Sequence, residues 1–489
     1  MAGAVIDTTE AQSSYLLTLP VELLDRICHY IEDANTFGHL RRASKELKGR
    51  TDKAFASRYF SNLQVKLHYD GLNDLLNVAT HPLFSKAVTS LEIVPDYFSE
   101  EFDYIYWEEG KYNRRGPGPE YLCPPDQPCG QMASKARLNG AKIQHRIRLQ
   151  QQTHIIQSGA DVEILTLALK DLHSLKTIYV GTVKRQSQYG SARTDSTTGQ
   201  SPECTDTSVQ SPYHNSIYNR SISHCLGVLL QSLAKTTQTV LNLHMGAAGY
   251  MYSDDNGGEG EIIHPEAIAL DCLRLSAIVR QGLRKSFKEL RSLSLIMDAW
   301  CSPVDKKGHA SLATFLSLAP TIEHLKLSMP RDHYSPGDIS DEWLSYAVLR
   351  AKFPYLHTLE VDDCRCTPES FITFLKRHLG TLRSLSICAV PWPEINTWRT
   401  FIEDLIGEYN AQLDEVSLRW LLAEYKGRVN FGSNIPPDCE SCKFYPSGPD
   451  FVADGWCKHL YFHRKGNAEV RQGLKELIST MALREWERR

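Results

Sequence analysis

The stretch Leu16–Phe60 reads LLTLPVELLDRICHYIEDANTFGHLRRASKELKGRTDKAFASRYF, and it decides how the N-terminal part of the chain folds. Pro20 suits the first turn of a helix, because the N–H that proline lacks would have no partner there. After Pro20, apolar residues recur every three or four positions, the spacing that places them on one helix face. They are Val21, Leu24, Ile27, Cys28 and Ile31. We therefore expect a helix that starts at this proline.

Two more short helices are expected in the rest of this stretch. Asn35 or Thr36 can cap the second helix, and Gly49 can end it in a left-handed conformation. Thr51 can cap the third. Their apolar residues are Phe37, Leu40, Ala43 and Leu47, and then Ala54, Phe55, Tyr59 and Phe60. Three helices this short enclose a small core, so we expect apolar surface to remain that another protein covers.

The stretch resembles an F-box, most closely the form common in fungal proteins. The match lies in Leu19-Pro20-x-Glu22-Leu23-Leu24-x-x-Ile27-x-x-Tyr30-Ile31 and in Leu40-Arg41-Arg42-Ala43-Ser44-Lys45-x-Leu47. A bare amphipathic helix does not require Leu-Pro before its periodic run, which makes the opening fairly specific. Leu47 stands in a region where many members carry an aromatic residue. The resemblance assigns residues 15–62 to the F-box.

The resemblance implies that the protein is an adaptor. F-box proteins bind a Skp-family adaptor through this unit, and through it a cullin–RING ubiquitin ligase, while the rest of the chain captures a protein substrate. Apolar anchors dominate such interfaces. The implied anchors are Leu19, Pro20, Leu23, Leu24, Ile27 and Leu40. Some of these side chains must also hold the three helices together, and sequence alone does not divide them between core and interface.

Basic residues mark the second predicted helix and its exit. They are Arg41, Arg42, Lys45, Lys48, Arg50 and Lys53. A solvated helix face is the usual explanation of such a run, and the interleaved aromatic residues of a nucleic-acid platform are missing. A complementary acidic surface on the adaptor is the alternative.

The composition of the 489 residues is that of a globular protein, with 42% hydrophobic and 23% charged residues. A net charge of −4 favours no nucleic-acid partner, and no apolar run approaches the roughly 20 residues that cross a bilayer. We therefore expect neither nucleic acid nor membrane as a partner. Residues 1–14 lack the features of a secretory signal and are expected to form a disordered tail. The 13 scattered cysteines indicate reduced thiols, hence a cytoplasmic or nuclear protein.

Five segments of the form Leu-x-x-Leu-x-Leu recur in the second half of the chain. Their apolar positions are Leu290/Leu293/Leu295, Ile322/Leu325/Leu327, Leu356/Leu359/Val361, Leu382/Leu385/Ile387 and Leu413/Val416/Leu418. The last two positions alternate with a polar residue, so both point to one buried face of a short strand. Helical spacing follows between the strands, in Leu312, Phe315 and Leu316 and in Phe371, Phe374, Leu375 and Leu379. These strand–helix units predict an α/β fold in which an irregular leucine-rich-repeat-like solenoid with parallel strands follows the three-helix F-box.

Weaker copies extend the repeat region to residues 63–425. They are Val88/Leu91/Ile93, Val162/Leu165/Leu167 and Leu175/Ile178/Val180, with a further copy that includes Leu241 and Leu243. Insertions over 95–131, 182–215 and 246–261 interrupt the array because they are rich in residues that disfavour helix and strand. Residues 426–489 are expected to form a loop and a capping helix from about Ala468, with Leu474, Leu477 and Ile478 facing inward.

One group of side chains has the residue types of a zinc site. It comprises Cys439, Cys442, Cys457, His459 and His463. Cys-x-x-Cys can present two thiolates to zinc, and Cys457 with either histidine could complete a tetrahedral site. The alternative is a set of reduced thiols in a loop, and we assign no metal or other cofactor. Weaker pairs are Cys364 with Cys366 and Cys123 with Cys129, and the acidic loop Asp254–Glu261 lacks the pattern of a calcium-binding EF-hand.

No catalytic motif stands out, because the sequence has neither a Gly-x-Ser-x-Gly elbow nor a P-loop. The hypothesis is therefore a non-catalytic receptor subunit of an SCF-type ubiquitin ligase. Two alternatives stay open. The chain could be a repeat scaffold with an F-box that binds a partner outside any ligase, or an enzyme whose metal lies in the C-terminal cysteine and histidine cluster.

Overall fold

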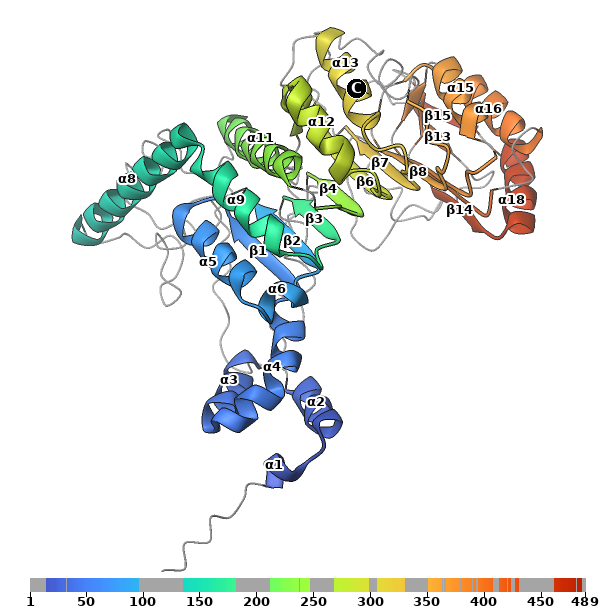
Figure 1. Ribbon diagram of the computed structural model, residues 1–489. Coiled ribbons are helices and arrows are strands. Elements are labelled where there is room, and N and C mark those ends of the chain that lie inside the picture. The colour runs from blue at the N-terminus through green and yellow to red at the C-terminus, as the bar shows by residue number, and fades with distance from the viewer. Residues whose placement is uncertain are drawn as a thin grey trace, which may run out of the picture.

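The computed structural model shows a mixed α/β protein in which helices cover one long, mostly parallel sheet (Figure 1). It describes residues 15–95, 135–181, 212–246, 268–298, 306–329, 351–423, 427–430 and 461–485. Within these ranges it leaves out the single residues 32, 237, 363, 365, 379, 389, 420 and 481 and the short segments 393–394 and 408–412. None of the helices in the described ranges combines the length and hydropathy that crossing a bilayer requires.

Four helices form an N-terminal helical unit. They are α1 (Tyr15–Thr18), α2 (Val21–Tyr30), α3 (Ala34–Ala43) and α4 (Lys45–Tyr59). The predicted start of the first long helix is confirmed, because Pro20 directly precedes α2 and its carbonyl accepts from the N–H groups of Leu23 and Leu24. Figure 1 shows this unit in blue, below the sheet.

The predicted boundaries of the next two helices are wrong. Asp33 caps α3 in place of Asn35 or Thr36, and its carboxylate accepts from the N–H of Thr36. Ser44 caps α4, where its hydroxyl accepts from the N–H of Leu47 at 3.1 Å. Asp and Ser are strong N-cap residues, so α4 starts earlier than predicted. Neither Gly49 nor Thr51 therefore marks a helix end, because both lie inside α4.

The main sheet runs through ten strands in the order β1-β2-β3-β4-β6-β7-β8-β9-β11-β14. All neighbours on this path are parallel except β11 and β14, which are antiparallel. The strands are β1 (Asn62–Lys66), β2 (Ser90–Val94), β3 (Thr177–Val180), β4 (Asn242–Met245), β6 (Ser292–Asp298), β7 (His324–Ser328), β8 (Thr358–Asp362), β9 (Ser384–Cys388), β11 (Glu415–Arg419) and β14 (Tyr461–Lys465). The short β5 (Ile268–Ala269) pairs with β6 beside this path. The sheet does not close into a barrel, since β1 and β14 lie at opposite ends.

The five strands predicted from the Leu-x-x-Leu-x-Leu segments are confirmed, and they are consecutive in the sheet. Their register aligns the middle apolar positions, which are Leu293, Leu325, Leu359, Leu385 and Val416. The third apolar positions of the five segments align in the same way, and all of these side chains are buried. They are Leu295, Leu327, Val361, Ile387 and Leu418. The alternation of apolar and polar residues therefore fixes which side chains enter the core.

One of the weaker copies is wrong and another is confirmed in part. Residues 162–167 are not a strand but belong to α9 (Ala160–Asp171), in which Leu167 is exposed while Leu165 is fully buried. The copy that includes Leu241 and Leu243 corresponds to β4, in which Leu243 and Met245 are buried, while Leu241 precedes the strand. The copies in β2 and β3 are confirmed. Helical and strand spacing coincide over such short apolar runs, which explains the error in α9.

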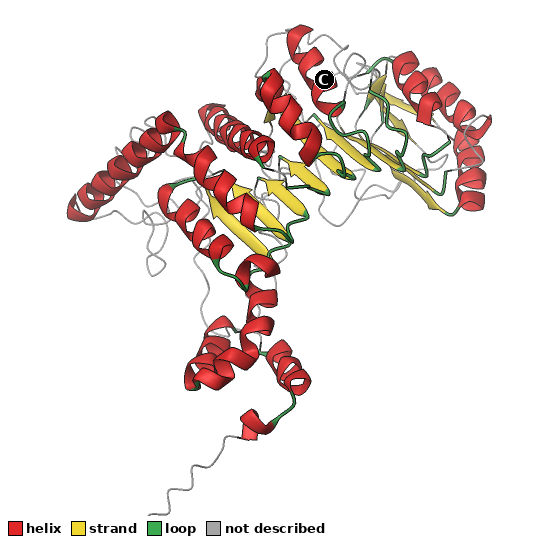
Figure 2. Cartoon of the chain, viewed as in Figure 1, coloured by secondary structure: helices red, strands yellow, loops and turns green. Residues whose placement is uncertain are grey.

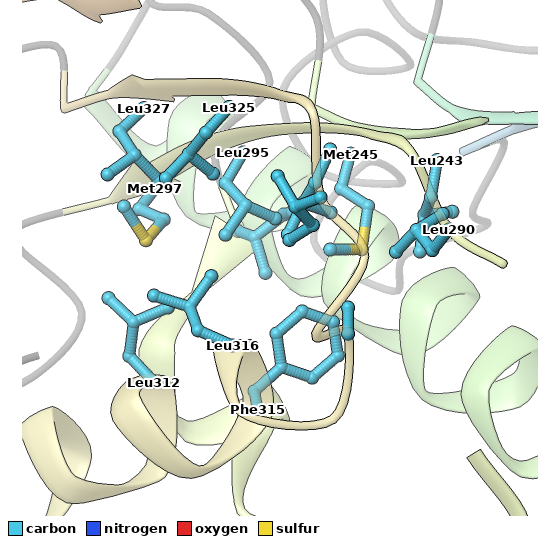
Figure 3. Packing of buried hydrophobic residues seen from close by; sticks show 14 of the residues in the cluster. Leu243, Met245, Leu290, Leu295, Met297, Leu312, Phe315, Leu316, Leu325 and Leu327 are labelled. Atoms are coloured by element: carbon cyan, nitrogen blue, oxygen red, sulfur yellow. The ribbon is translucent and has the colours of Figure 1, made fainter. Parts of the chain in front are cut away.

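Helices cover one face of the sheet, as Figure 2 shows in red beside the yellow strands. They include α5 (Tyr69–Thr80), α6 (Phe84–Ala87), α9, α11 (Pro212–Lys235), α12 (Ala277–Ser286), α13 (Lys306–Leu316), α15 (Pro368–His378), α16 (Ile395–Gly407) and α18 (Asn467–Thr480), with the 3₁₀ turn η2 (Leu270–Leu273). Helix α8 (Lys135–Ser158) contacts α9 and α5. In α13 the predicted inward residues Leu312, Phe315 and Leu316 face the strand leucines (Figure 3). Buried residues from Val65 to Leu477 form one continuous hydrophobic core.

The C-terminal segment ends the array. The predicted helix is α18, in which Leu474 and Leu477 are buried and Ile478 is partly buried. The preceding strand β14 joins the main sheet antiparallel to β11, which the sequence pattern did not predict. A second, four-stranded sheet consists of β10 (Pro391–Trp392), β12 (Leu422–Ala423), β13 (Gly427–Asn430) and β15 (Ala482–Glu485). Leu379 is the last of the four inward-facing residues predicted for the helix around Phe371. It directly follows α15 and lies outside the described residues.

His378 at the end of α15 is buried and holds two backbone groups together. Its Nε2 accepts from the N–H of Phe353 at 3.1 Å, and its Nδ1 lies 2.8 Å from the carbonyl oxygen of Phe374. The ring can make both bonds only when it is neutral, with its proton on Nδ1. Burial accordingly lowers the pKa of His378 from its ordinary value of 6.5.

We predict that His378 makes the free energy of unfolding fall as the pH drops below about 6.5. Below that pH the unfolded chain binds a proton at this residue while the folded chain does not. His378→Leu should lower stability at neutral pH by about 1–3 kcal/mol, because the N–H of Phe353 loses its acceptor, and should flatten the pH dependence. Denaturant unfolding at several pH values, with His324→Gln on an exposed site as the control, tests this. Equal pH slopes for wild type and His378→Leu contradict it.

Candidate protein-docking surface on the N-terminal helices

The inner face of α2 belongs to the core of the helical unit. Leu24 and Cys28 lie one turn apart and are buried, together with Phe37 of α3 and Leu47 of α4. Burial raises the pKa of the Cys28 thiol, so this side chain acts as a small neutral core group at neutral pH.

The outer face of α2 carries three exposed apolar side chains. Leu23 is 47% exposed, Ile27 38% and Tyr30 72%. They are spaced by four and three residues, so they share one helix face, which we call the α2 strip. Tyr15 and Val21 are exposed nearby in sequence, and these five residues are among the eleven large exposed apolar side chains of the described chain. Single exposed apolar residues are ordinary, but so many within two short helices indicate a protein-binding surface.

The structure separates the six predicted anchors into three groups. Leu23, Ile27 and Pro20 are exposed, and Leu19 and Leu40 are half-buried. Leu24 is fully buried and belongs to the core, so its assignment as a contact residue is corrected: it cannot reach a partner while α2 stays packed. Tyr30 and Tyr15 were not among the predicted anchors. The four-and-three spacing of Leu23, Ile27 and Tyr30 was the signal that could have identified the strip.

Two arginines of α4 hold both ends of α2 in place. The guanidinium of Arg50 donates to the carbonyl oxygens of Leu17 and Leu19, just before α2. Nη1 of Arg58 donates to the carbonyl oxygens of Cys28 and His29 at 3.0 and 3.1 Å. The last carbonyls of a helix have no partner within the helix and carry partial negative charge, so a cation stabilises them. These contacts fix the position of the α2 strip relative to α4.

The basic run therefore has two different roles. Arg41 forms an ion pair with Asp52, and its guanidinium lies 3.6 Å from the ring centre of Phe55. Arg41 and Arg50 are thus structural, which corrects their interpretation as part of a solvated face. The exposed members of the run are Arg42, Lys45, Lys48 and Lys53.

Aromatic side chains join the helical unit to the sheet. The ring of Phe60, just after α4, stacks on Phe84 of α6 with 4.2 Å between ring centres, and His81 stacks on Phe84 at 3.9 Å. Phe55 of α4 contacts Phe60 and Phe84. The first strand begins at Asn62, so α4 leads almost directly into the sheet. The helical unit is thus attached through packed rings as well as through the chain itself.

The face of the sheet opposite the helices is polar. Neighbouring strands pair their side chains there: Nζ of Lys326 lies 3.1 Å from Oε2 of Glu360, and Tyr179 stacks on His244 with 4.7 Å between ring centres. Burial and the nearby Glu92 raise the pKa of Tyr179. This face thus carries charges of both signs together with aromatic rings.

The predicted zinc group falls mostly outside the described residues, which include only its fifth member. His463 lies on β14, where its Nε2 is 3.7 Å from Oε1 of Glu415. Of the weaker pairs, Cys364 and Cys366 are buried, while Cys123, Cys129 and the loop Asp254–Glu261 lie outside the described residues. Within the described ranges, no three His, Cys, Asp or Glu side chains lie close enough together to hold a metal ion.

Comparison with models of known protein families finds none that matches this chain, and comparison with curated proteins finds no match either.

Proposed function

We propose that the protein is the substrate-recognition subunit of an SCF-type ubiquitin ligase. The helical unit is an F-box that binds a Skp-family adaptor and, through it, a cullin. The strand–helix array is a leucine-rich-repeat-like solenoid that binds a protein substrate. The protein itself performs no chemistry in this proposal, because ubiquitin transfer depends on holding a substrate lysine close to the charged enzyme.

The observation that carries the proposal is the α2 strip. Leu23 and Ile27 belong to the sequence pattern that resembles an F-box, and they are exposed on a helix whose opposite face is fully packed. A folded unit gains nothing from exposing these side chains to water, so a partner surface is the physical reason for them. The arginine contacts from α4 present the strip in a fixed orientation, which reduces the entropy that binding would otherwise cost.

Co-purification with the adaptor and a cullin tests this function. Full-length protein is expressed with a fungal Skp-family adaptor, and a cullin–RING pair is added before size-exclusion chromatography. We expect the four proteins to elute as one complex. Elution with the adaptor but without the cullin would instead support a scaffold that acts outside a ligase, and failure to bind the adaptor would refute the F-box assignment.

A further inference from the structure

Helix α8 projects from the sheet beside α9 and α5, and its first half extends away from the other labelled helices (Figure 1). Its second half is packed, because Gln152 and Ile155 are buried. The face opposite these two residues is formed by positions 143, 147, 150 and 154, spaced by four, three and four. All four side chains are exposed, with Ile143 at 57% and Ile147 at 41%.

The charge of α8 differs from that of the chain. Its 24 residues include five lysines and arginines and no Asp or Glu, whereas the whole chain has a net charge of −4. Among its described side chains, Arg146 is exposed beside the isoleucines. Arg148, nearer the packed end, lies 3.9 Å from the carboxylate of Asp70. The free part of α8 thus combines a local positive charge with two apolar side chains one turn apart.

We propose that the outer face of α8 is a docking site for an acidic amphipathic helix of a protein partner. Such a helix brings carboxylates to the basic residues and apolar side chains to Ile143 and Ile147, so both features of the face are used. A nucleic acid would use the charge but not the isoleucines, and α8 has no Phe, Tyr or Trp on which bases could stack. A membrane-surface helix needs a wider apolar face with aromatic or leucine side chains.

This site is independent of the α2 strip, so it does not depend on the proposed ligase function. Fluorescence anisotropy with the full-length chain tests it, using a labelled synthetic helix of Glu and Leu in heptad spacing. The competing probes are a single-stranded oligonucleotide and phosphatidylserine vesicles. We expect the acidic helix to bind more tightly than either, and added salt to weaken its binding.

Substitutions on α8 locate the site. Ile143→Ser with Ile147→Ser should weaken binding of the acidic helix at least tenfold, and Arg146→Glu should weaken it to a similar degree. Ile278→Ser on α12, which also removes an exposed isoleucine, should leave binding unchanged. All four substituted positions are exposed, and thermal melting checks that the three variants stay folded. The proposal is overturned if wild type does not bind the acidic helix, if the oligonucleotide or the vesicles bind more tightly, or if the α8 variants bind like wild type.

Discussion

Replacing Leu23, Ile27 and Tyr30 with serine should strongly weaken binding of the Skp-family adaptor while the chain stays folded. The three side chains form the α2 strip and are exposed, so the free protein loses little stability without them. Truncating a hot-spot residue at the centre of an interface costs about 2 kcal/mol or more, and Tyr is among the residue types enriched there. We expect the triple substitution to weaken adaptor binding by more than about 100-fold, measured by isothermal titration calorimetry.

Two control variants test whether the loss of binding is specific to the α2 strip. Ile278→Ser and Leu167→Ser remove exposed apolar side chains from α12 and α9 and should leave adaptor binding unchanged. Leu24→Ala should reduce adaptor binding by a different route, because it opens a cavity in the core of the helical unit and destabilises it by about 2–5 kcal/mol. Retention of adaptor binding by the folded triple variant would remove the α2 strip from the proposed interface.

Gly282→Ala should be among the most destabilising single substitutions in the array. Gly282 lies inside α12 at its crossing with α11, where a β-carbon would be 2.2 Å from the carbonyl oxygen of Ala234. At the same crossing, the hydroxyl of Ser286 in α12 donates a hydrogen bond to the carbonyl oxygen of Leu233 in α11 at 2.8 Å. Backbone atoms cannot move aside as a flexible side chain can, so the two helices must separate. We expect a loss of at least about 2 kcal/mol of unfolding free energy.

Gly227→Ala is the matched control for that substitution. Gly227 lies in α11, the partner of α12 at the crossing, and a β-carbon there would meet no atom within 4 Å. An alanine inside a helix is favoured over glycine by about 0.5–1 kcal/mol, so this variant should be slightly more stable than wild type. Denaturant unfolding of the two variants compares them directly. If Gly282→Ala unfolds at the same denaturant concentration as Gly227→Ala, the close approach of the two helices is wrong.

The repeat pattern predicted the centre of the fold well because two constraints coincide there. In β8 and β9, strand alternation places Leu359, Val361, Leu385 and Ile387 in the core, and the neighbouring strands repeat the same alternation in register. A parallel sheet covered on one face must bury such residues, so the apolar positions were sufficient to locate the strands.

Prediction failed where a tertiary contact decided between two local possibilities. Val162 and Leu165 fit a strand as well as a helix, and packing on α11 and α5 made them part of α9. Arg50 had the composition of a solvated face, but its carbonyl acceptors lie more than thirty residues earlier in the chain. For the candidate site, the resemblance pointed to α2, on which three exposed apolar side chains lie, while the burial of Leu24 depended on where α4 packs.

The ring stack between Phe60 and Phe84 influences how precisely the array is positioned relative to the N-terminal helical unit. The main sheet spans nine inter-strand steps from β1 to β14, which at about 4.8 Å each amount to about 43 Å. A rotation of about 10° at the stack would therefore shift the far end of the sheet by about 7 Å. Stiffness at this one joint thus matters more for positional accuracy than stiffness anywhere further along the array. A substitution at Phe60 or Phe84 would therefore change the position of the far strands relative to the helical unit without altering the α2 strip itself.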